Sequence, residues 1–442
     1  MKFSIVTFGC RVNQSDSLGF EEQFLAAGGQ SVAADAADVV VVNTCSVTAS
    51  ADQGARQTIR RIARTNPRAR IVVTGCYATR ERDEVAQLPN VECVVANDHK
   101  PQLLRLVRVA GEADADRAGA FATTAERYGD GDGHCGAVIE PGVAGRTAFT
   151  LRVQTGCAEA CSYCIIPVTR GAPRSASLQH LVSEVARVKA AGFKEVVLTG
   201  VHLGSYGRDL ESPGNLLSLL TALRDRFEDP GPGGAPPLLF RISSLEPMDC
   251  TPEIVALVRD SACFAPHFHL PLQHGSARVL RAMRRPYDLA YYAALVDSIR
   301  GGIPNASIGS DLIVGFPGES DDDFEQLASY LEHSPLTHLH VFPYSDRPGT
   351  AASSMANRSA GLVVKARGAR LRQIGSTLTR RFVESQVGTV HRALTLEDGA
   401  LVVTGNYLKV RVPPGRSRNE WVEVRITRCE PDLRGELVSA GA

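Results

Sequence analysis

The sequence has no long hydrophobic run and no surplus of charge of either sign. No apolar stretch approaches the roughly 20 residues that a membrane-spanning helix needs, so we expect no membrane partner. Lys and Arg total 48, as do Asp and Glu. No overall field therefore favours nucleic acid or a lipid surface, and a polyanion would have to bind a local basic patch. Residues 1–9 are too short and wrongly flanked for a signal peptide.

Cysteine is too sparse for a disulfide scaffold. Eleven cysteines in 442 residues fit reduced thiols that serve as metal ligands better than a secreted framework, so we expect a cytoplasmic protein. The hydrophobic fraction of 44% and the charged fraction of 22% are ordinary for a globular chain. This length predicts roughly two to four domains, each able to bury a core.

Three of the cysteines lie close together within residues 156–171. Cys157, Cys161 and Cys164 follow the spacing C-x3-C-x2-C. Thiolates hold iron–sulfur clusters, and a short loop of this kind can wrap one cluster. Three thiolates leave one iron of a cubane cluster open, and an open metal position implies a substrate or cofactor there. Tyr163, just before the last cysteine, is an aromatic side chain that can lie flat against a purine-like ring.

This spacing, with an aromatic residue in that position, resembles the signature of radical S-adenosylmethionine (SAM) enzymes. In that superfamily the open iron chelates the amino and carboxylate groups of SAM. Two other interpretations are a zinc loop and half of a ferredoxin. Zinc usually takes four protein ligands in a closed site, and the ferredoxin run is C-x2-C-x2-C. Both fit this loop less well.

Residues 1–110 alternate between strands and helices. Continuous apolar runs predict buried strands, and apolar residues spaced three to four apart predict helices. A βαβαβ order is typical of a doubly wound open sheet with parallel strands. The predicted strands cover residues 4–8, 38–43, 70–74 and 91–95, and the predicted helices cover residues 15–28 and 49–65.

A cysteine follows each of the first three predicted strands, namely Cys10, Cys45 and Cys76. The carboxyl ends of parallel strands meet at one edge of a sheet, where such folds bind ligands. We therefore expect these distant cysteines to converge on a second iron–sulfur cluster, again with an open iron. The alternative is three buried small hydrophobic residues. Cys93 lies inside the fourth strand, and we assign it a structural role.

Residues 111–147 are rich in Ala, Gly and Asp and predict a poorly ordered linker. The alternating Asp and Gly of residues 128–134 superficially resemble a calcium loop. They lack the glutamate that ends such a loop and the flanking helices, so a calcium site is not favoured. We assign no metal role to His134 or Cys135 on this linker.

Residues 148–376 alternate again between strands and helices. Each strand-to-helix step predicts a right-handed unit, and a series of such units predicts a barrel or partial barrel. The cysteine loop follows the first strand, at the face where barrel enzymes place their chemistry. The predicted strands cover 149–154, 195–199, 238–243, 267–270, 307–314 and 338–344, and the predicted helices cover 177–191, 214–227, 251–259, 287–300 and 320–333.

The segments that follow the other strands should line the same mouth. Glycines such as Gly200 let a ligand approach the backbone closely, and polar side chains there can meet a nucleoside or an amino acid. We predict Tyr163, Gly200, Glu246, Gln273 and Asp311 as contacts of bound SAM, although polar residues at such positions often only cap helices. No role is assigned to three histidines that are more often packed than catalytic, His202, His267 and His269.

Residues 377–442 change to short strands and predict a small antiparallel barrel, an architecture often used to bind RNA. Trp421, the only tryptophan, is expected in the core of that barrel. Basic residues recur at 365–381 and 56–64, where they form either an RNA-binding face or a solvated one. The predicted strands cover 387–390, 392–396, 401–404, 408–412 and 421–426.

The whole arrangement resembles the methylthiotransferase family. That family combines an N-terminal domain with three cysteines, a radical-SAM barrel with the C-x3-C-x2-C loop and a C-terminal barrel of the TRAM type. The resemblance covers nearly the whole chain. The family replaces an unactivated C–H bond by C–S–CH3, either on an adenosine beside the tRNA anticodon or on an aspartate of a small-subunit ribosomal protein.

Within this family the chain is most similar to the branch that acts on N6-threonylcarbamoyladenosine. Residues 8–13, Phe-Gly-Cys-Arg-Val-Asn, are similar to that branch's Leu-Gly-Cys-Lys-Val-Asn. His274 is a departure that resembles the ribosomal-protein branch. Arg241 follows a barrel strand, and we expect it or a nearby cation to bind the carboxylate of the threonylcarbamoyl group. The other matching segments are residues 57–61, 74–78, 241–247 and 340–345.

The resemblance implies SAM and two 4Fe-4S clusters as cofactors. One cluster would bind Cys157, Cys161 and Cys164, and the other the three cysteines at the strand ends. A radical derived from SAM would remove the hydrogen at C2 of the target adenine. The second cluster would present the sulfur, and a second SAM would supply the methyl group.

The implied macromolecular substrate is the tRNA anticodon stem-loop, whose target adenosine must leave the stack to reach the mouth of the barrel. A low-potential donor of the flavodoxin or ferredoxin type would supply electrons, and we expect a monomer. The alternatives are methylthiolation of isopentenyladenosine or of the ribosomal protein. A more remote alternative is a non-catalytic electron carrier with two clusters.

Overall fold

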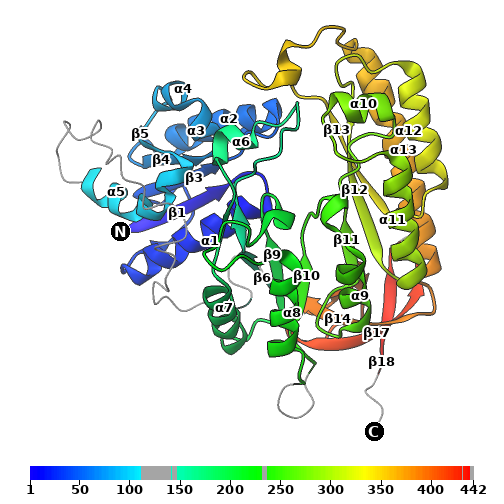
Figure 1. Cartoon of the computed structure of the whole chain (residues 1–442). Helices are drawn as coiled ribbons and strands as arrows, with labels where there is room; N and C mark the ends of the chain where they lie inside the picture. The colour runs from blue at the N-terminus through cyan, green and yellow to red at the C-terminus, as the bar shows by residue number, and fades with distance from the viewer. Residues whose placement is uncertain (111–140, 142–146, 231–235, 431, 439–442) are drawn as a thin grey trace.

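The computed structural model describes residues 1–110, 141, 147–230, 236–430 and 432–438. The linker predicted at 111–147 lies almost wholly outside the described residues, as do His134 and Cys135. Figure 1 shows an N-terminal sheet and its helices beside a larger unit of strands and helices, with the C-terminal strands below that unit. Within these ranges, no helix has both the length and the apolar character that crossing a membrane requires.

The N-terminal domain is an open parallel sheet. Its strands, in sheet order, are β2 (Gln30–Ser31), β1 (Lys2–Thr7), β3 (Val39–Thr44), β4 (Arg70–Gly75) and β5 (Val91–Val95). Strand β3 is buried along its whole length, as expected for an apolar strand covered on both faces.

Helices cover both faces of that sheet. Helix α1 (Arg11–Ala26) packs Phe20 and Phe24 against one face. Helix α2 (Ala49–Thr65) packs Ile59 and Ile62 against the other. These two cores confirm the predicted doubly wound sheet. Shorter helices follow the later strands: α3 (Cys76–Arg80), α4 (Arg82–Ala86) and α5 (Leu103–Ala110).

The central unit is a partial barrel built from two parallel sheets of three strands. The first contains β6 (Ala148–Arg152), β9 (Glu195–Thr199) and β10 (Leu239–Ile242), and the second contains β11 (His267–His269), β12 (Ser307–Val314) and β13 (His338–Pro343). A bridge between Phe240 and Phe264 joins the two sheets. The six strands confirm the strands predicted for residues 148–376.

Helices lie outside this partial barrel, and one apolar core runs between them and the strands. The long helices match the predicted ones: α7 (Leu178–Ala190), α8 (Leu216–Phe227), α9 (Pro252–Asp260), α11 (Leu289–Gly302) and α12 (Asp321–His333). Two short helices were not predicted, α6 (Ile166–Arg170) and α10 (Ala277–Ala282).

A long helix, α13 (Gly361–Ser385), connects the partial barrel to the C-terminal strands. It buries Leu371 and Leu378 in the central core. Its first half is tied to the residues around α12, because Arg367 pairs with Glu319 at 2.5 Å and Arg370 pairs with Glu325 at 2.5 Å. The basic run predicted at 365–381 is therefore partly internal.

The C-terminal strands form a closed barrel in the order β14-β15-β16-β18-β17. The strand predicted at 387–390 is wrong as a separate element, because Val390 already begins the longer β14. The fifth strand is instead β18, which pairs in parallel with β16. Trp421 is half-buried over Arg392 and lies outside the apolar core, contrary to expectation. The strands are β14 (Val390–Leu396), β15 (Leu401–Thr404), β16 (Lys409–Arg411), β17 (Trp421–Arg428) and β18 (Arg434–Val438).

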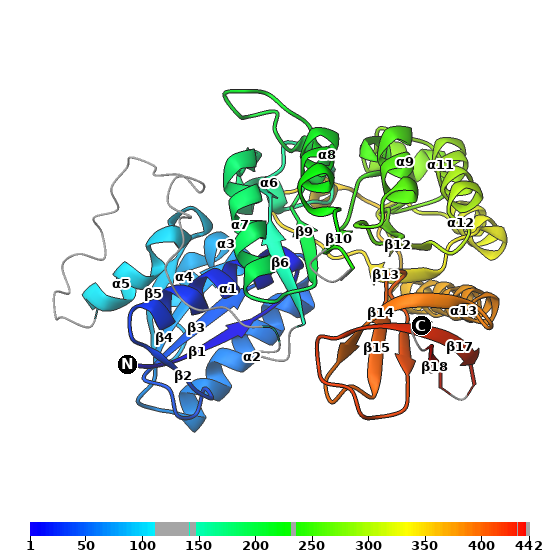
Figure 2. The ribbon, with the colours of Figure 1, turned by 90° about the horizontal axis from the view of Figure 1, so that it is seen from below.

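Figure 2 shows the N-terminal domain and the C-terminal barrel lying against the same partial barrel. Polar contacts join all three units. Arg347, which follows β13, donates to Asp52 of α2 at 2.6 Å. Asn406 of the C-terminal barrel donates to the carbonyl of Asn305 at 2.9 Å. These hydrogen bonds hold both flanking units against the partial barrel.

Candidate functional site

The first cysteine triad, Cys157, Cys161 and Cys164, lies on the loop between β7 (Gln154–Thr155) and α6. The loop closes on itself through a hydrogen bond from the Cys157 amide to the carbonyl of Gly171 at 3.0 Å. Burial, together with the nearby thiols of Cys161 and Cys157, raises the pKa of Cys164 to about 12. The three sulfurs are thus close enough to interact, as one cluster would require.

Gln154 holds this loop in place, a role that the sequence did not reveal. Its side-chain oxygen accepts the amides of Val201 and His202 at 3.0 and 2.9 Å. Its side-chain nitrogen donates to the carbonyls of Thr155 and Gly156 at 2.8 Å each. The cysteine loop is therefore fixed to the segment that follows β9.

Gly200 and His202 lie in that segment. A Cβ added at Gly200 would lie 2.8 Å from Leu203 and 3.1 Å from Gln154, so the glycine permits the close packing beside the cysteine loop. His202 hydrogen-bonds Asp249 at 2.8 Å. Burial alone would lower its pKa, but the hydrogen bonds with Asp249 and Cys157 raise the pKa of His202 to about 9. The imidazole thus contacts the triad directly.

Glu246 approaches the cysteine loop from the segment after β10, and Tyr163 lies on the loop itself. Arg285 donates to the sulfur of Cys161 at 3.2 Å and forms an ion pair with Glu246. Glu246 is therefore tied to the triad through Arg285, a residue that sequence reasoning missed. Tyr163 packs against the apolar cluster that contains Met283, and burial raises its pKa well above the usual range.

Asp311 lies on β12, and Gln273 lies in the segment after β11, bridged to the neighbouring Leu312. Asp311 is bonded to His269 at 2.9 Å and to His340 at 3.1 Å. Burial alone would raise its pKa, but these two histidines hold the pKa of Asp311 well below its usual range. Gln273 has φ of +67°, which is unusual for a residue with a side chain, and its amide donates to the carbonyl of Asp311. His269, to which no role was assigned, is therefore a direct partner of a predicted site residue.

The second triad, Cys10, Cys45 and Cys76, lies at the carboxyl ends of β1, β3 and β4. Burial, together with the nearby thiols of Cys10 and Cys76, raises the pKa of Cys45 to about 12. The predicted convergence of these three cysteines is thus present. Gly9 and Gly75 precede two of them with positive φ, and a Cβ at Gly9 would overlap Cys45.

Helix α6 brings the two triads together. It begins just after Cys164, and its last residue, Arg170, hydrogen-bonds the thiol of Cys76. Burial alone would lower the pKa of Arg170, but Cys76 and Asp16 raise it above the usual range. Asn97 donates to the carbonyl of Thr169 at 2.8 Å. The loop that carries one triad therefore continues directly into the wall of the other.

A buried ion-pair network anchors Arg170. Asp16 of α1 is fully buried and pairs with Lys100 at 2.5 Å, with Arg170 at 3.4 Å and with Arg152. Arg170 also donates to Asn13 at 2.5 Å. The network joins the N-terminal domain to the first strand of the partial barrel and fixes the guanidinium beside Cys76.

Both triads fit a cluster held by three thiolates. All six cysteines are free thiols. The backbone packs tightly beside them and has no room for a side chain, because a Cβ at Gly75 would overlap the carbonyl of Thr44 and one at Gly156 would overlap the carbonyl of Ala172. In the described part of the chain, neither triad has a fourth cysteine as a neighbour in these contacts.

The structure corrects the expectation for Arg241 and shows where His274 lies. Arg241 is fully buried, pairs with Glu195 at 2.8 Å and donates to the carbonyl of Gly405 at 2.8 Å. Its guanidinium therefore has partners within the protein, and its predicted bond to a substrate carboxylate is wrong. His274 is also fully buried, beside Glu319, and it accepts the amide of Ser276 at 3.0 Å. This residue supports a loop and lines no surface.

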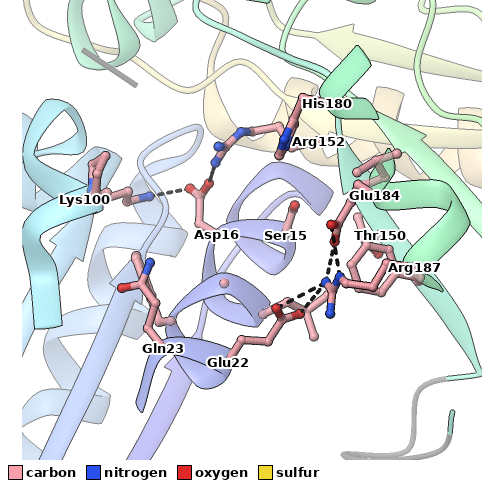
Figure 3. Close-up of a pocket in the computed structure, with 16 residues that line it drawn as sticks. Ser15, Asp16, Glu22, Gln23, Lys100, Thr150, Arg152, His180, Glu184 and Arg187 are labelled. Carbon is pink, nitrogen blue, oxygen red and sulfur yellow. Dashed lines mark hydrogen bonds and ion pairs between the residues drawn. The ribbon is translucent and has the colours of Figure 1, made fainter. Parts of the chain in front are cut away.

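A cavity of about 130 Å3 lies between α1 and α7. Figure 3 shows Asp16 between Lys100 and Arg152 on one side of it, and Arg187 between Glu22 and Glu184 on the other. None of its lining residues belongs to either triad. We interpret it as the seam between the N-terminal domain and the partial barrel.

Two family models match parts of the chain, and several known proteins are similar to most of it. Residues 2–96 match the family described as "uncharacterized protein family UPF0004", and residues 151–331 match the radical SAM superfamily. The threonylcarbamoyladenosine tRNA methylthiotransferase MtaB of Aquifex aeolicus is 37% identical over 93% of this chain and 96% of its own length. The chain belongs to the radical-SAM methylthiotransferase family.

Other members are also similar along their length. The MtaB of Bacillus subtilis is 33% identical over 91% of this chain and 88% of its own. The tRNA-2-methylthio-N6-dimethylallyladenosine synthase of Thermobifida fusca is 32% identical over 97% of this chain and 87% of its own. Among solved structures, the radical SAM methyltransferase TsrM of Kitasatospora setae has a TM-score of 0.56 at 15% identity, over 80% of this chain and 75% of its own. That likeness supports the fold alone.

As a member of this family, the protein is an enzyme of the radical SAM class, and its cofactors are SAM and two 4Fe-4S clusters. Each triad falls inside one of the two matched regions. Cys10, Cys45 and Cys76 lie within residues 2–96, and the C-x3-C-x2-C loop lies within residues 151–331.

Proposed function

We propose that this methylthiotransferase replaces the hydrogen at C2 of N6-threonylcarbamoyladenosine by a methylthio group, on the adenosine immediately 3′ of the tRNA anticodon. The observation that carries the proposal is the 37% identity, over nearly the full length of both chains, to a relative named for that reaction. Four further relatives with the same name, at 31–33% identity, support it.

In this proposal the two triads hold the two clusters. Cys157, Cys161 and Cys164 bind the cluster that takes SAM, and the strand-end triad binds the other. When bound, SAM and its cluster supply the radical chemistry that removes the C2 hydrogen, and the second cluster supplies sulfur to that carbon. We assign Tyr163, Gly200, Glu246, Gln273 and Asp311 to the SAM pocket, because they surround the first triad or follow neighbouring strands.

The remaining residues position these groups. Gln154 fixes the cysteine loop to the segment after β9, and Arg285 holds Cys161 through a donated hydrogen bond. Arg170 places a fixed positive charge beside Cys76, and its side chain is buried from solvent. Rigid surroundings of this kind hold the reacting carbon between the two triads. The exclusion of water suppresses side reactions.

The partners follow from the substrate. The anticodon stem-loop would lie across the C-terminal barrel, residues 377–442, and the exposed cations of α13, such as Arg380. The target base would leave the stack and enter the mouth of the barrel. We further propose a cytoplasmic monomer, with residues 1–110 and 148–376 as its other units, that receives electrons from a flavodoxin or ferredoxin type of donor.

Methylthiolation of isopentenyladenosine is the second candidate, because the Thermobifida fusca relative named for dimethylallyladenosine is 32% identical over 97% of this chain. The ribosomal-protein candidate rests only on the resemblance of the segment around His274, whose side chain is fully buried and lines no exposed surface. An electron carrier without catalysis is also less consistent with two triads that each leave a cluster position to an outside ligand.

The test is to offer the reconstituted enzyme three substrates under reducing, anaerobic conditions. These are tRNA with threonylcarbamoyladenosine, tRNA with isopentenyladenosine, and the small-subunit ribosomal protein. We expect a methylthio product on the first tRNA only, detected by mass spectrometry of the digested nucleosides. Preferential turnover of either other substrate would overturn the proposed function and leave the two-cluster chemistry in place.

A further inference from the structure

Arg11 lies directly after Cys10, where the three folded units of the chain meet. Its guanidinium donates to the hydroxyl of Tyr407 at 3.0 Å and lies 5.9 Å from the centre of that ring. Tyr407 belongs to the turn between β15 and β16 of the C-terminal barrel. The same ring lies 5.2 Å from the ring of His267 in the partial barrel. Side chains of all three units thus converge at Tyr407, and Arg11 connects this junction to the residue after Cys10.

The charge of Arg11 is not neutralised within the described part of the chain. No ion pair there joins it to a carboxylate, and its side chain is only partly buried. The other cations around the two triads each have an acidic partner. Arg170 pairs with Asp16, Arg241 with Glu195 and Arg285 with Glu246. Within the described part of the chain, Arg11 is therefore a cation whose guanidinium can donate to the carboxylate of a ligand.

Tyr407, which accepts the hydrogen bond from Arg11, has a strained backbone. The tyrosine has φ of +69°, in the left-handed region that favours glycine, and 43% of its surface is exposed. Such backbone is strained for a residue with a side chain and recurs at functional sites. The buried guanidinium of Arg241 lies 4.4 Å from the centre of the same ring. The ring of Tyr407 thus packs against Arg241, and its hydroxyl accepts the hydrogen bond from Arg11.

The chemistry of the substrate places its N6 group at this junction. In adenine, C2 and C6 flank the same ring nitrogen, so the group on N6 and the reacting carbon share one edge of the base. Under the proposed function, sulfur reaches C2 from the triad that contains Cys10. Arg11, the next residue in the chain, is then a cation near the edge of the base that carries the N6 group. A threonylcarbamoyl group carries a carboxylate there, and a planar guanidinium binds a carboxylate through two parallel hydrogen bonds.

We propose that Arg11, held by Tyr407, binds the carboxylate of the threonylcarbamoyl group and selects this substrate. The inference rests on the proposed function and deepens it, since it names the residue that recognises the N6 decoration. Arg241 cannot take this role because its guanidinium already pairs with Glu195 and with backbone carbonyls. An isopentenyl group has no carboxylate and so cannot form this charge-assisted hydrogen bond with Arg11.

The experiment compares two anaerobic ligands for the reconstituted enzyme: an anticodon stem-loop with threonylcarbamoyladenosine, and the same stem-loop with that carboxylate as its methyl ester. Affinity is measured by fluorescence anisotropy. We expect the wild-type enzyme to prefer the acid by about 10- to 100-fold, the range of a hydrogen bond to a charged group. Arg11→Gln should abolish this preference, and Arg11→Lys should retain part of it.

Two further variants keep the test decisive. Arg226→Gln removes an exposed cation on the distant helix α8 and should leave the ratio of acid to ester affinity unchanged. Tyr407→Phe removes the hydrogen bond to Arg11 without altering any residue beside Cys10. It therefore tests the positioning of Arg11 even if Arg11→Gln loses iron. We expect an intermediate fall in the ratio for Tyr407→Phe.

The outcomes separate this inference from the proposed function. If the wild-type enzyme methylthiolates only tRNA with isopentenyladenosine, the proposed function is wrong. If the wild-type enzyme methylthiolates the threonylcarbamoyl substrate and both Arg11→Gln and Tyr407→Phe keep the full acid preference, only the role of Arg11 is wrong.

Discussion

Gly75 illustrates how a single residue shapes the second triad. It joins β4 to Cys76 with φ of +98°, and a Cβ there would overlap the carbonyl of Thr44. Gly75→Ala must therefore move either the end of β3 or Cys76 itself. We expect this variant, after anaerobic reconstitution, to bind about half the iron of the wild-type protein, because only one triad is disturbed.

Gly28→Ala is the matched control for that change. Gly28 also has a positive φ, of +80°, but a Cβ there would meet no atom within 4 Å. Gly28→Ala bears the same backbone strain of roughly 1–2 kcal/mol, but its added Cβ overlaps no neighbouring atom. It should therefore bind as much iron as the wild-type protein. Iron is counted per chain by plasma mass spectrometry. Full iron in Gly75→Ala would contradict the role of the strand-end triad as a cluster site.

At the residue scale, the sequence predicted which cysteines lie together but not the residues that surround them. The spacing of Cys157, Cys161 and Cys164 is local, and the strand ends that carry the other triad follow from parallel-sheet geometry. Arg170 and Arg285 act through partners that are distant in the chain, so no spacing reveals them. A faint signal did exist, because Arg170 is the one charge in the apolar run that follows Cys164.

At the scale of elements, helix α6 and its anchor decide how the two triads face each other. Asp16 is fully buried and shared by Lys100, Arg152 and Arg170. Removing one member of a buried ionic network leaves charge without compensation and costs about 3–5 kcal/mol. We expect Asp16→Asn to lower the free energy of unfolding by that amount, measured by chemical denaturation followed by circular dichroism.

The surface pair of Asp98 and Arg174 provides the control. These side chains lie 3.2 Å apart, and Asp98 is 60% exposed. Asp98→Asn removes the same charge from an exposed pair and should cost less than about 1 kcal/mol. Equal losses in the two variants would mean that the Asp16 network contributes no more than a surface ion pair.

The same network sets part of the acid sensitivity. Burial alone would raise the pKa of Asp16, but Lys100, Arg170 and Arg152 lower it to about 2, from 3.8. A lowered pKa contributes stability that is present above the unfolded value and lost as the pH falls through the folded one. The contribution of about 2 kcal/mol should therefore disappear between about pH 4 and pH 2. In Asp16→Asn, this acid-dependent loss should be absent.

Predicting elements from the sequence worked best where they are long and periodic. The six strands of the partial barrel and its five long helices follow from apolar patterning. The short helices α6 and α10 were missed, since five or six residues carry too little periodicity. In the C-terminal barrel, β18 (Arg434–Val438) was missed because two charged residues interrupt its pattern, and its pairing with β16 is non-local.

At the scale of the whole molecule, the contacts dock the C-terminal barrel firmly on the partial barrel. Arg392 donates to the carbonyl of Ala262 at 2.8 Å, and Asn406 donates to Asn305. Composition and spacing predicted the order of the three units. They could not predict the junction at Arg11, Tyr407 and Arg241, because its members lie in different units and no local pattern relates them.

Two truncations test where the catalytic unit ends and what the C-terminal barrel does. Ending the chain after Gln386 keeps all of α13 and removes only the barrel of strands β14–β18. We expect this variant to fold and to cleave SAM, but to bind tRNA at least tenfold more weakly at physiological salt, with a shallower salt dependence, because phosphate contacts are lost. Affinity at several salt concentrations and the yield of 5′-deoxyadenosine measure the two effects.

Ending the chain after Ser376 is the matched comparison. This cut also removes Leu378 and Phe382, which are 1% and 8% exposed. Each buried side chain of this size contributes about 1.5–3 kcal/mol, so the shorter variant should be less stable than the longer one by several kcal/mol. That difference would place the structural boundary after α13, beyond residue 377. Equal stability of the two variants would support the boundary expected from the sequence, and undiminished tRNA affinity in both would contradict a role for the barrel in RNA binding.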